Sequence, residues 1–407
     1  MLRHAAYFVL VFVGGFAFGK LHPALSDIML KLQVQASRLQ TLSESQDILS
    51  NLSFHAAGID ENNIEEIRGQ LERKIYGQPV VRSKPQFKYM TLEGFRDNYL
   101  NNLDFHEEFL ETLEQNRRDV IEISGSFPEL AGYNWKTVLM RNDGSATRRL
   151  FIFHQGHDGG AFDFERSVKA IRSLIDAGYD VLVASMPGIG WNRLKNVRVK
   201  TWDGDGFVTG LHENRHELFE LIDTGTGHYI KFFVEPVVAS IDAAISLRDY
   251  STITMAGESG GGWTTTLVAA MDSRIDYSIS FSGTLPFFAR HKSKDLGDVE
   301  QFSSAFYRSF SYPKLYELAS AAAGKHRVHY QIFNTRDYCC FDGESVATLR
   351  RYHAGRDAPA HWDFRIHVFD GGGHGFTSET FAQVVEWLEE AAKDQSVSLA
   401  EETAATR

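Results

Sequence analysis

The sequence has few cysteines and no excess of positive charge. Only two of its 407 residues are cysteines, the adjacent Cys339 and Cys340. This count excludes a disulfide framework, and it excludes a zinc or iron–sulfur site built from several cysteines of one chain. We expect two reduced, partly buried thiols, and the alternative is a strained disulfide between the two neighbours. Asp and Glu number 53 against 42 Lys and Arg, and the net charge of −11 argues against non-specific binding to nucleic acid.

Long apolar runs are also scarce, and the clearest one lies at the N-terminus. It extends from Ala5 to Gly19, after Arg3 and His4. A membrane-spanning helix needs roughly 17–25 apolar residues, so this run is short for one. We interpret residues 1–25 as an uncleaved single-pass anchor, and a cleaved secretory signal is the alternative. For an anchor, the positive-inside tendency places the N-terminus in the cytoplasm and the rest of the chain on the extracytoplasmic side. After cleavage of a signal, the rest of the chain would instead be secreted.

Residues 26–117 form a polar region without a recognisable propeller or substrate-gating domain. Up to about residue 75 its apolar residues follow a helical spacing, which predicts a helical stalk. Too few heptads are present to indicate a coiled coil. The residues that carry this spacing are Ile28, Leu32, Leu39, Leu42, Leu49 and Leu52.

From about residue 118 short apolar strands alternate with helices. This alternation predicts a mostly parallel sheet that is covered by helices on both faces. We assign residues 118–393 to this domain, with insertions at about 191–227 and 285–312, and residues 394–407 to a polar tail. In such sheets the functional residues lie on loops at the carboxyl ends of strands. The expected strands are at residues 120–123, 136–140, 150–153, 180–184, 251–256, 277–281, 328–333 and 364–369.

One of these strand ends carries Gly257-Glu258-Ser259-Gly260-Gly261, followed by a helical run from Trp263 to Met271. A Gly-x-Ser-x-Gly sequence between a strand and a helix is typical of a nucleophile elbow. The helix N-terminus behind the serine can stabilise negative charge with its backbone N–H groups. Ser259 is therefore the candidate nucleophile.

A serine needs a base that accepts its proton, and the base needs an acid that orients it. Two later strand ends carry suitable residues in the expected order. Asp337 follows the strand at 328–333, and His374 lies in a glycine-rich segment after the strand at 364–369. Asp342 is the alternative acid, but Asp337 is closer to the end of its strand. We expect Ser259, Asp337 and His374 to form a catalytic triad.

In these motifs the chain resembles the α/β-hydrolase superfamily. The resemblance covers about residues 118–393, and the Ser-Gly-Gly end of the elbow and the segment around His374 are similar to those of esterases and prolyl-oligopeptidase-like members. It implies an α/β-hydrolase fold and a serine hydrolase that works through an acyl-enzyme.

Such a mechanism needs two N–H donors for the oxyanion. We expect one from Gly260. In the family a His-Gly pair precedes the second donor: if Gly156 matches the glycine of this pair, the donor is His157, and if His154 matches its histidine, the donor is Gly156. The spacing His154-x-x-His157-Asp158 lacks a helix and a third ligand, so we expect no metal site and no cofactor.

The sequence thus predicts a membrane-anchored serine hydrolase that cleaves a carboxylic ester on a small molecule or a polymer. A peptidase with the same triad, or a non-catalytic scaffold of the same fold, is the alternative. The sequence leaves open whether the insertions are mobile lids or surface excursions. Asp203-Gly204-Asp205-Gly206 faintly resembles a calcium loop, but the remaining oxygen ligands are missing.

Overall fold

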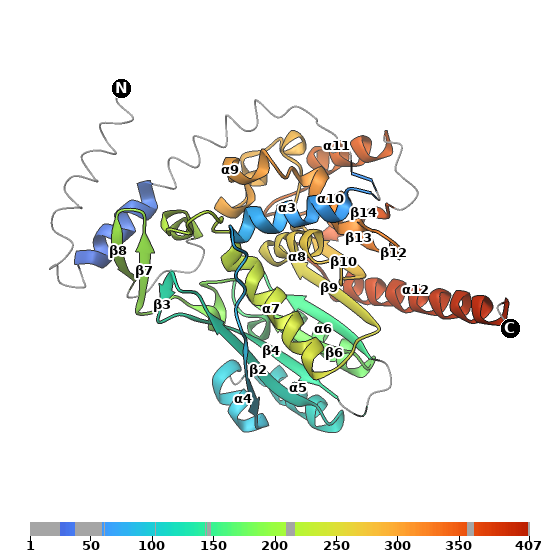
Figure 1. Ribbon diagram of the computed structural model, residues 1–407. Coiled ribbons are helices and arrows are strands. Elements are labelled where there is room, and N and C mark those ends of the chain that lie inside the picture. Colours follow the sequence, from blue (N-terminus) through green and yellow to red (C-terminus); the bar gives the residue numbers. More distant parts are fainter. Residues whose placement is uncertain are drawn as a thin grey trace.

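A nine-stranded sheet forms the centre of the protein (Figure 1). The structure is a computed structural model, and it describes residues 25–36, 59–60, 62–101, 103–142, 144, 148–208, 216–355 and 362–405. The order of the strands in the sheet is β1 (Gln86–Met90), β2 (Asp119–Ser126), β4 (Asn134–Arg141), β6 (Asp180–Ala184), β5 (Arg149–His154), β9 (Thr252–Glu258), β10 (Tyr277–Phe281), β13 (Val328–Arg336) and β14 (Phe364–Gly372). The pairs from β1 to β6 are antiparallel, and every pair from β6 to β14 is parallel.

The strands bury both of their faces, because alternate apolar side chains point into two different cores. In β5, Leu150 and Ile152 belong to one core and Phe151 and Phe153 to the other. The first core is covered by α3 (Ile64–Tyr76), α7 (Lys231–Leu247), α8 (Gly260–Met271), α10 (Tyr312–Ser320) and α11 (Gly343–Ala354). The second is covered by α4 (Leu92–Tyr99), α5 (Asp104–Gln115), α6 (Glu165–Asp176) and α12 (Ser378–Ala405). This architecture confirms the predicted α/β-hydrolase fold.

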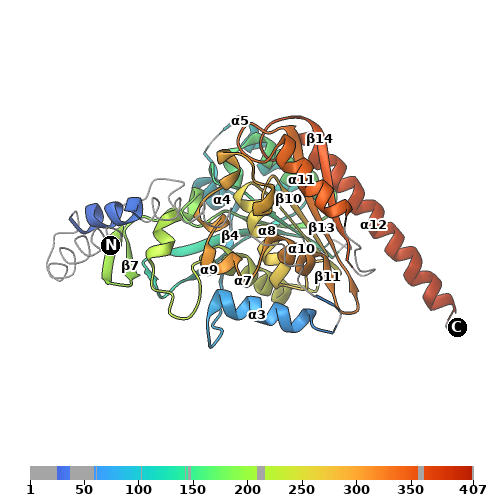
Figure 2. The same ribbon diagram turned by 90° about the horizontal axis from the view of Figure 1, so that it is seen from above.

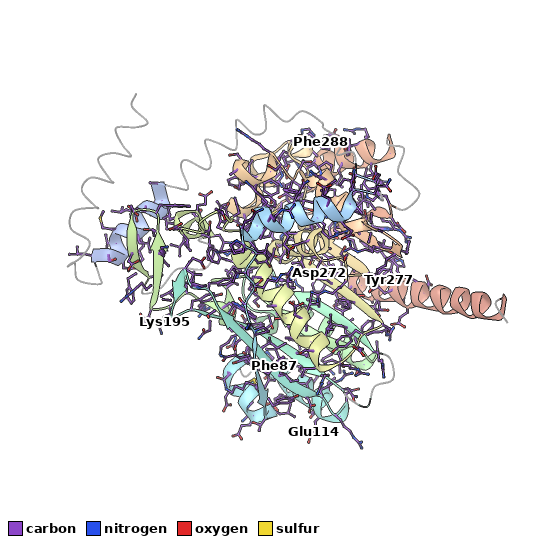
Figure 3. The ribbon with its side chains drawn as sticks, in the orientation of Figure 1. Phe87, Glu114, Lys195, Asp272, Tyr277 and Phe288 are labelled. Carbon is purple, nitrogen blue, oxygen red and sulfur yellow. A yellow bond between two sulfur atoms is a disulfide. The ribbon has the colours of Figure 1, made fainter. Side chains whose placement is uncertain are left out.

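The body of the protein begins well before residue 118, which corrects the predicted start of the domain. β1 pairs with β2 and forms an edge of the sheet, where Phe87 is exposed (Figure 3). α3 packs on α8, and its buried Arg68 donates to the carbonyl oxygens of Ala270 at 2.6 Å and Ala321 at 2.8 Å. The reason for the difference is that these elements carry many polar residues on their outer faces, so their apolar contacts are too sparse to stand out in the sequence.

Part of the predicted stalk is described, and it is helical at residues 25–36. This helix lies beside β7 in both views (Figures 1 and 2). Its buried apolar residues are Leu30 and Val34, whereas Ile28 and Leu32 are exposed, so the predicted apolar positions face outward here. Residues 1–24 and 37–58, which carry the predicted anchor and the middle of the predicted stalk, lie outside the described residues. Of the helices that are described, none combines the length and the apolar character needed to cross a membrane.

The two insertions contain short elements packed near the carboxyl edge of the sheet. The first holds η3 (Gly190–Asn192), the strands β7 (Val197–Thr201) and β8 (Gly204–Val208), and η4 (His216–Leu221). β7 pairs with β8 and with β3 (Leu130–Ala131), and the calcium-like segment covers the end of the turn between β7 and β8 and the first residues of β8. The second holds η5 (Phe287–Ala289), η6 (Ser293–Leu296), η7 (Val299–Gln301) and α9 (Ser304–Tyr307). α12 continues through most of the predicted tail and projects from the body (Figure 2).

Candidate active site

Ser259 lies where β9 ends and α8 begins, as predicted. Its backbone has φ 53° and ψ −124°, a conformation that is strained for any residue except glycine. Such strain is a property of the nucleophile elbow, since the sharp turn lifts the serine above the edge of the sheet. The side chain is partly exposed, while both of its neighbours, Glu258 and Gly260, are buried.

The glycines of the elbow are required because other backbone segments approach closely. A methyl group on Gly257 would collide with the carbonyl of Gly261, and one on Gly261 would collide with the carbonyl of His154. These contacts pack the elbow directly against the loop that follows β5. The pattern of glycines around Ser259 therefore follows from packing density rather than from flexibility.

Asp337 and His374 meet at the same edge of the sheet. Nδ1 of His374 donates to Oδ2 of Asp337 at 2.9 Å, and both side chains are buried. Burial raises the pKa of Asp337, but the hydrogen bond and the charge of His374 outweigh it, and the pKa lies below its ordinary value. Asp342, the alternative, instead forms ion pairs with Lys292 and Lys294. Of the two carboxylates, the structure brings Asp337 to His374.

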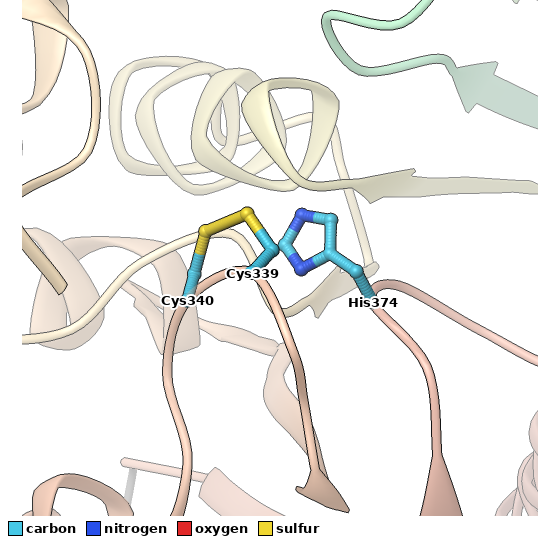
Figure 4. Close-up of side chains that lie close together, drawn as sticks. All are labelled: Cys339, Cys340 and His374. Atoms are coloured by element: carbon cyan, nitrogen blue, oxygen red, sulfur yellow. A yellow bond between two sulfur atoms is a disulfide. The ribbon is translucent and has the colours of Figure 1, made fainter. Parts of the chain in front are cut away.

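Oδ1 of Asp337 is held by the turn that follows it. The backbone N–H groups of Cys339 and Cys340 donate to this oxygen at 2.9 and 3.0 Å. The same turn brings the two sulfur atoms together, and they form a disulfide beside the imidazole of His374 (Figure 4). The expectation of two reduced thiols is therefore wrong. The two cysteines lie in one tight turn, because both of their backbone N–H groups donate to the carboxylate of Asp337.

Two residues that the sequence analysis missed hold the backbone of the His374 loop. Asn334 donates from Nδ2 to the carbonyls of Gly373 and Gly375, both at 2.9 Å. Arg166 of α6 donates to the carbonyl of His374 at 3.2 Å. Asn334 could have been noticed as a polar residue near the end of a buried strand, whereas Arg166 lies 208 positions from His374 and has no local signal.

Glu258 connects this loop to the elbow. Its Oε1 accepts hydrogen bonds from Gln155 and, at 2.8 Å, from Arg166. Burial raises the pKa of this carboxyl above its ordinary value, and Arg166 and Gln155 offset only part of the effect. A methyl group on Gly375 would collide with Glu258, so the residue before Ser259 touches the residue after His374.

Within the part of the chain that the structure describes, Nε2 of His374 is buried and has no hydrogen-bond partner. This nitrogen is therefore free to accept a proton.

The loop after β5 lies against the elbow on its other side. A Cβ atom on Gly156 would be 2.8 Å from Cβ of Ser259, and one on Gly260 would collide with the imidazole of His157. Among the described residues, the N–H groups of Gly156 and His157 donate to no backbone carbonyl. Both predicted alternatives for the second oxyanion donor thus lie beside Ser259. The imidazole of His154 is buried against the carbonyl of Gln155, and burial lowers its pKa to about 4.

His157 also takes part in a cluster that the local sequence does not indicate. Its Nε2 lies 2.9 Å from Oε1 of Glu300, 3.1 Å from Oδ2 of Asp298 and 3.3 Å from Nδ1 of His216. Burial lowers the pKa of His157, but Asp298 and Glu300 outweigh it and raise the pKa to about 9. The partners come from both insertions. The expectation of no metal site considered only the segment from His154 to Asp158. The side chains that surround His157 come from outside this segment.

No model of a known protein family and no curated protein matches the chain. Solved structures are similar to it in architecture. One is acetyl xylan esterase 1 from Thermoanaerobacterium sp., with 11% identity, a TM-score of 0.48, and coverage of 85% of this chain and 98% of that one. A second is an acetyl xylan esterase from Paenibacillus sp., with 13% identity, a TM-score of 0.48, and coverage of 86% and 99%. A third is the acylaminoacyl peptidase of Pyrococcus horikoshii, with 12% identity, a TM-score of 0.43, and coverage of 67% and 48%. Similarity at this level identifies no substrate for this chain.

Proposed function

We propose that this protein is a serine hydrolase that cleaves carboxylic esters, with Ser259 as nucleophile, His374 as base and acid, and Asp337 as the residue that orients His374. The observation that carries the proposal is the buried hydrogen bond from His374 to Asp337 at the edge of the sheet where Ser259 occupies a strained elbow. A hydroxyl on a strained turn and an imidazole fixed by a carboxylate are the parts that acyl transfer needs.

The first half of the reaction forms an acyl-enzyme. Oγ of Ser259 attacks the acyl carbon of the ester, and its proton moves to Nε2 of His374. Asp337 keeps the other proton on Nδ1 and stabilises the imidazolium that results. The tetrahedral intermediate then collapses, the bond to the alcohol breaks, and His374 gives its proton to the leaving oxygen. In the second half, water takes the place of the alcohol, and the acid is released.

Negative charge develops on the acyl oxygen in both halves. The N–H of Gly260 is the first donor, because it is the first N–H of α8 and no turn of helix precedes it. The second donor comes from Gly156 or His157, whose N–H groups lie on the loop packed against Ser259. Removal of one such donor typically costs 10²–10³-fold in rate, about 3–4 kcal/mol.

The type of scissile bond is tested by a panel of matched substrates. We expect purified protein to hydrolyse p-nitrophenyl esters with short acyl chains and to leave aminoacyl p-nitroanilides and N-blocked peptides intact. Higher kcat/KM on the anilides would replace the esterase assignment with the peptidase alternative. No hydrolysis of either class, together with no reaction with a fluorophosphonate, would leave the non-catalytic scaffold.

We further propose that residues 1–25 anchor the protein in a membrane, with the hydrolase on the extracytoplasmic side. The apolar run from Ala5 to Gly19 and the basic residue before it support this proposal. The full chain should then sediment with membranes from its native host and resist extraction with alkaline carbonate. A native N-terminus beyond Gly19, found by sequencing, would make this a secreted enzyme instead.

A further inference from the structure

Four side chains from three separate segments converge beside the proposed oxyanion loop. His157 follows β5, and His216 is the first residue of η4 in the first insertion. In the second insertion, Asp298 precedes η7 and Glu300 lies within it. The ligand atoms of the two histidines and Glu300 all lie within 4.8 Å of one another. His157, His216 and Glu300 are buried, while the side chain of Asp298 is 47% exposed.

The proton on His216 is placed by its surroundings. Nε2 of His216 lies 3.0 Å from the carbonyl oxygen of Pro187. A carbonyl only accepts hydrogen bonds, so Nε2 carries the proton of the neutral ring. The lone pair on Nδ1 then faces Oε2 of Glu300 at 3.3 Å and Nε2 of His157 at 3.3 Å. A lone pair that faces a carboxylate needs a positive charge between them. A backbone carbonyl on the far nitrogen is also the usual outer partner of a histidine that binds a metal.

The spacing of the ligand atoms of His157, His216 and Glu300 fits a small cation, and Asp298 approaches the same nitrogen of His157. Zinc bonds of about 2.0–2.1 Å in a tetrahedral site place neighbouring ligand atoms about 3.3 Å apart. The distances from Nε2 of His157 to Glu300, Asp298 and His216 are 2.9, 3.1 and 3.3 Å. A metal needs neutral imidazoles as ligands, so the ion displaces the proton that His157 otherwise holds against Asp298 and Glu300. The two neutral imidazoles and two carboxylates then carry a charge of −2 together, which a divalent cation neutralises. Nitrogen and oxygen ligands of this kind suit zinc and its neighbours among the divalent transition metals.

We propose that His157, His216, Glu300 and Asp298 bind one divalent transition-metal ion of the zinc class. The exposed side of Asp298 provides the path by which the ion enters. The ion would join both insertions to the loop after β5. It would also fix the imidazole of His157, which lies against Gly260, the residue that follows the proposed nucleophile. The role is one of positioning, because the ion lies behind this imidazole and the ligand set uses no residue of the proposed triad.

The test measures metal content directly and does not depend on hydrolysis. Purified tag-free protein is stripped with a chelator, supplied with one equivalent of Zn²⁺, passed through a desalting column and analysed by mass spectrometry for zinc. We expect about one zinc per chain in the wild type and a rise in Tm when zinc is added. Ser259→Ala should bind zinc equally well, which separates this proposal from the proposed function.

Three variants locate the site. Glu300→Gln should retain no zinc after desalting, and its Tm should not respond to zinc. Asp298→Asn alters a half-exposed side chain, so the fold should persist, and competition with a chromophoric chelator should show zinc affinity lower by at least about tenfold. The matched control is His326→Ala, which removes an exposed histidine that pairs with Asp363 at 3.2 Å and should leave zinc binding unchanged.

The proposal is overturned if the wild type retains no zinc and shows no shift in Tm. It is equally overturned if Asp298→Asn and Glu300→Gln retain zinc as well as His326→Ala does. In either case the cluster is held together by protons shared between imidazoles and carboxylates.

Discussion

Replacing Asp337 with asparagine should disable the enzyme without disturbing its fold, and the structure explains why. Oδ1 of Asp337 accepts two backbone N–H groups, those of Cys339 and Cys340. The carbonyl oxygen of an asparagine must take this position, because an NH₂ group there would face two other donors. The NH₂ group is then directed at Nδ1 of His374, where it can only donate. His374 is forced into the tautomer that carries its proton on Nε2, and this nitrogen can no longer accept the proton of Ser259.

The expected loss in kcat/KM is about 10⁴-fold, the size of the loss when the same change is made in a serine-protease triad. This corresponds to about 5 kcal/mol of transition-state stabilisation. The assay is hydrolysis of a short-chain p-nitrophenyl ester, with thermal unfolding as the check on the fold. The matched control is Asp342→Asn, whose carboxylate is paired with Lys292 and Lys294 and not with His374. A loss of less than tenfold in Asp337→Asn, or a larger loss in Asp342→Asn, would refute the reasoning.

Two other predictions concern the groups that support the site. Asn334→Ala removes the donor to one buried carbonyl, that of Gly375, and to one partly buried carbonyl, that of Gly373. The free energy of unfolding should therefore fall by about 1–3 kcal/mol and kcat/KM by roughly 10–100-fold. Asn98→Ala, which removes an exposed hydrogen bond to Gly94, should change neither, and equal effects in both variants would refute the role of Asn334. Glu258→Gln removes a carboxyl whose pKa is raised by burial above 4.5. The folded state holds this proton more tightly than the unfolded state, so the wild type loses stability as pH rises from 4.5 through the raised value. The Tm of the variant minus that of the wild type should therefore be more positive at about pH 7 than at about pH 4, and a difference that stays constant would contradict the assignment.

The positions of the proposed triad were predictable because each residue lies at the end of a strand with a strong local pattern. β6 and β10 have the predicted bounds, and β9 and α8 meet at Ser259. The choice of Asp337 over Asp342 rested only on its distance from the strand, and the structure places Asp337 against His374. In these cases the information lies within a few residues of the chain.

What the sequence could not predict depends on contacts between distant segments. The loop of His374 is held by Arg166, and His157 meets Glu300 across 143 positions, so neither pair leaves a local pattern. Edge elements such as β1 were missed for a different reason. Its residues are mostly exposed, and an exposed strand has no clear alternation of apolar and polar residues.

The central claim is that Ser259 is a nucleophile activated by its surroundings. It is tested most directly by labelling the wild-type protein with a fluorophosphonate, digesting it, and locating the label by mass spectrometry. We predict a single label, on the peptide that contains Ser259, and no label in Ser259→Ala with an unchanged Tm. A label on another serine, or labelling that persists in Ser259→Ala, would contradict the account, as would a folded wild type that does not react.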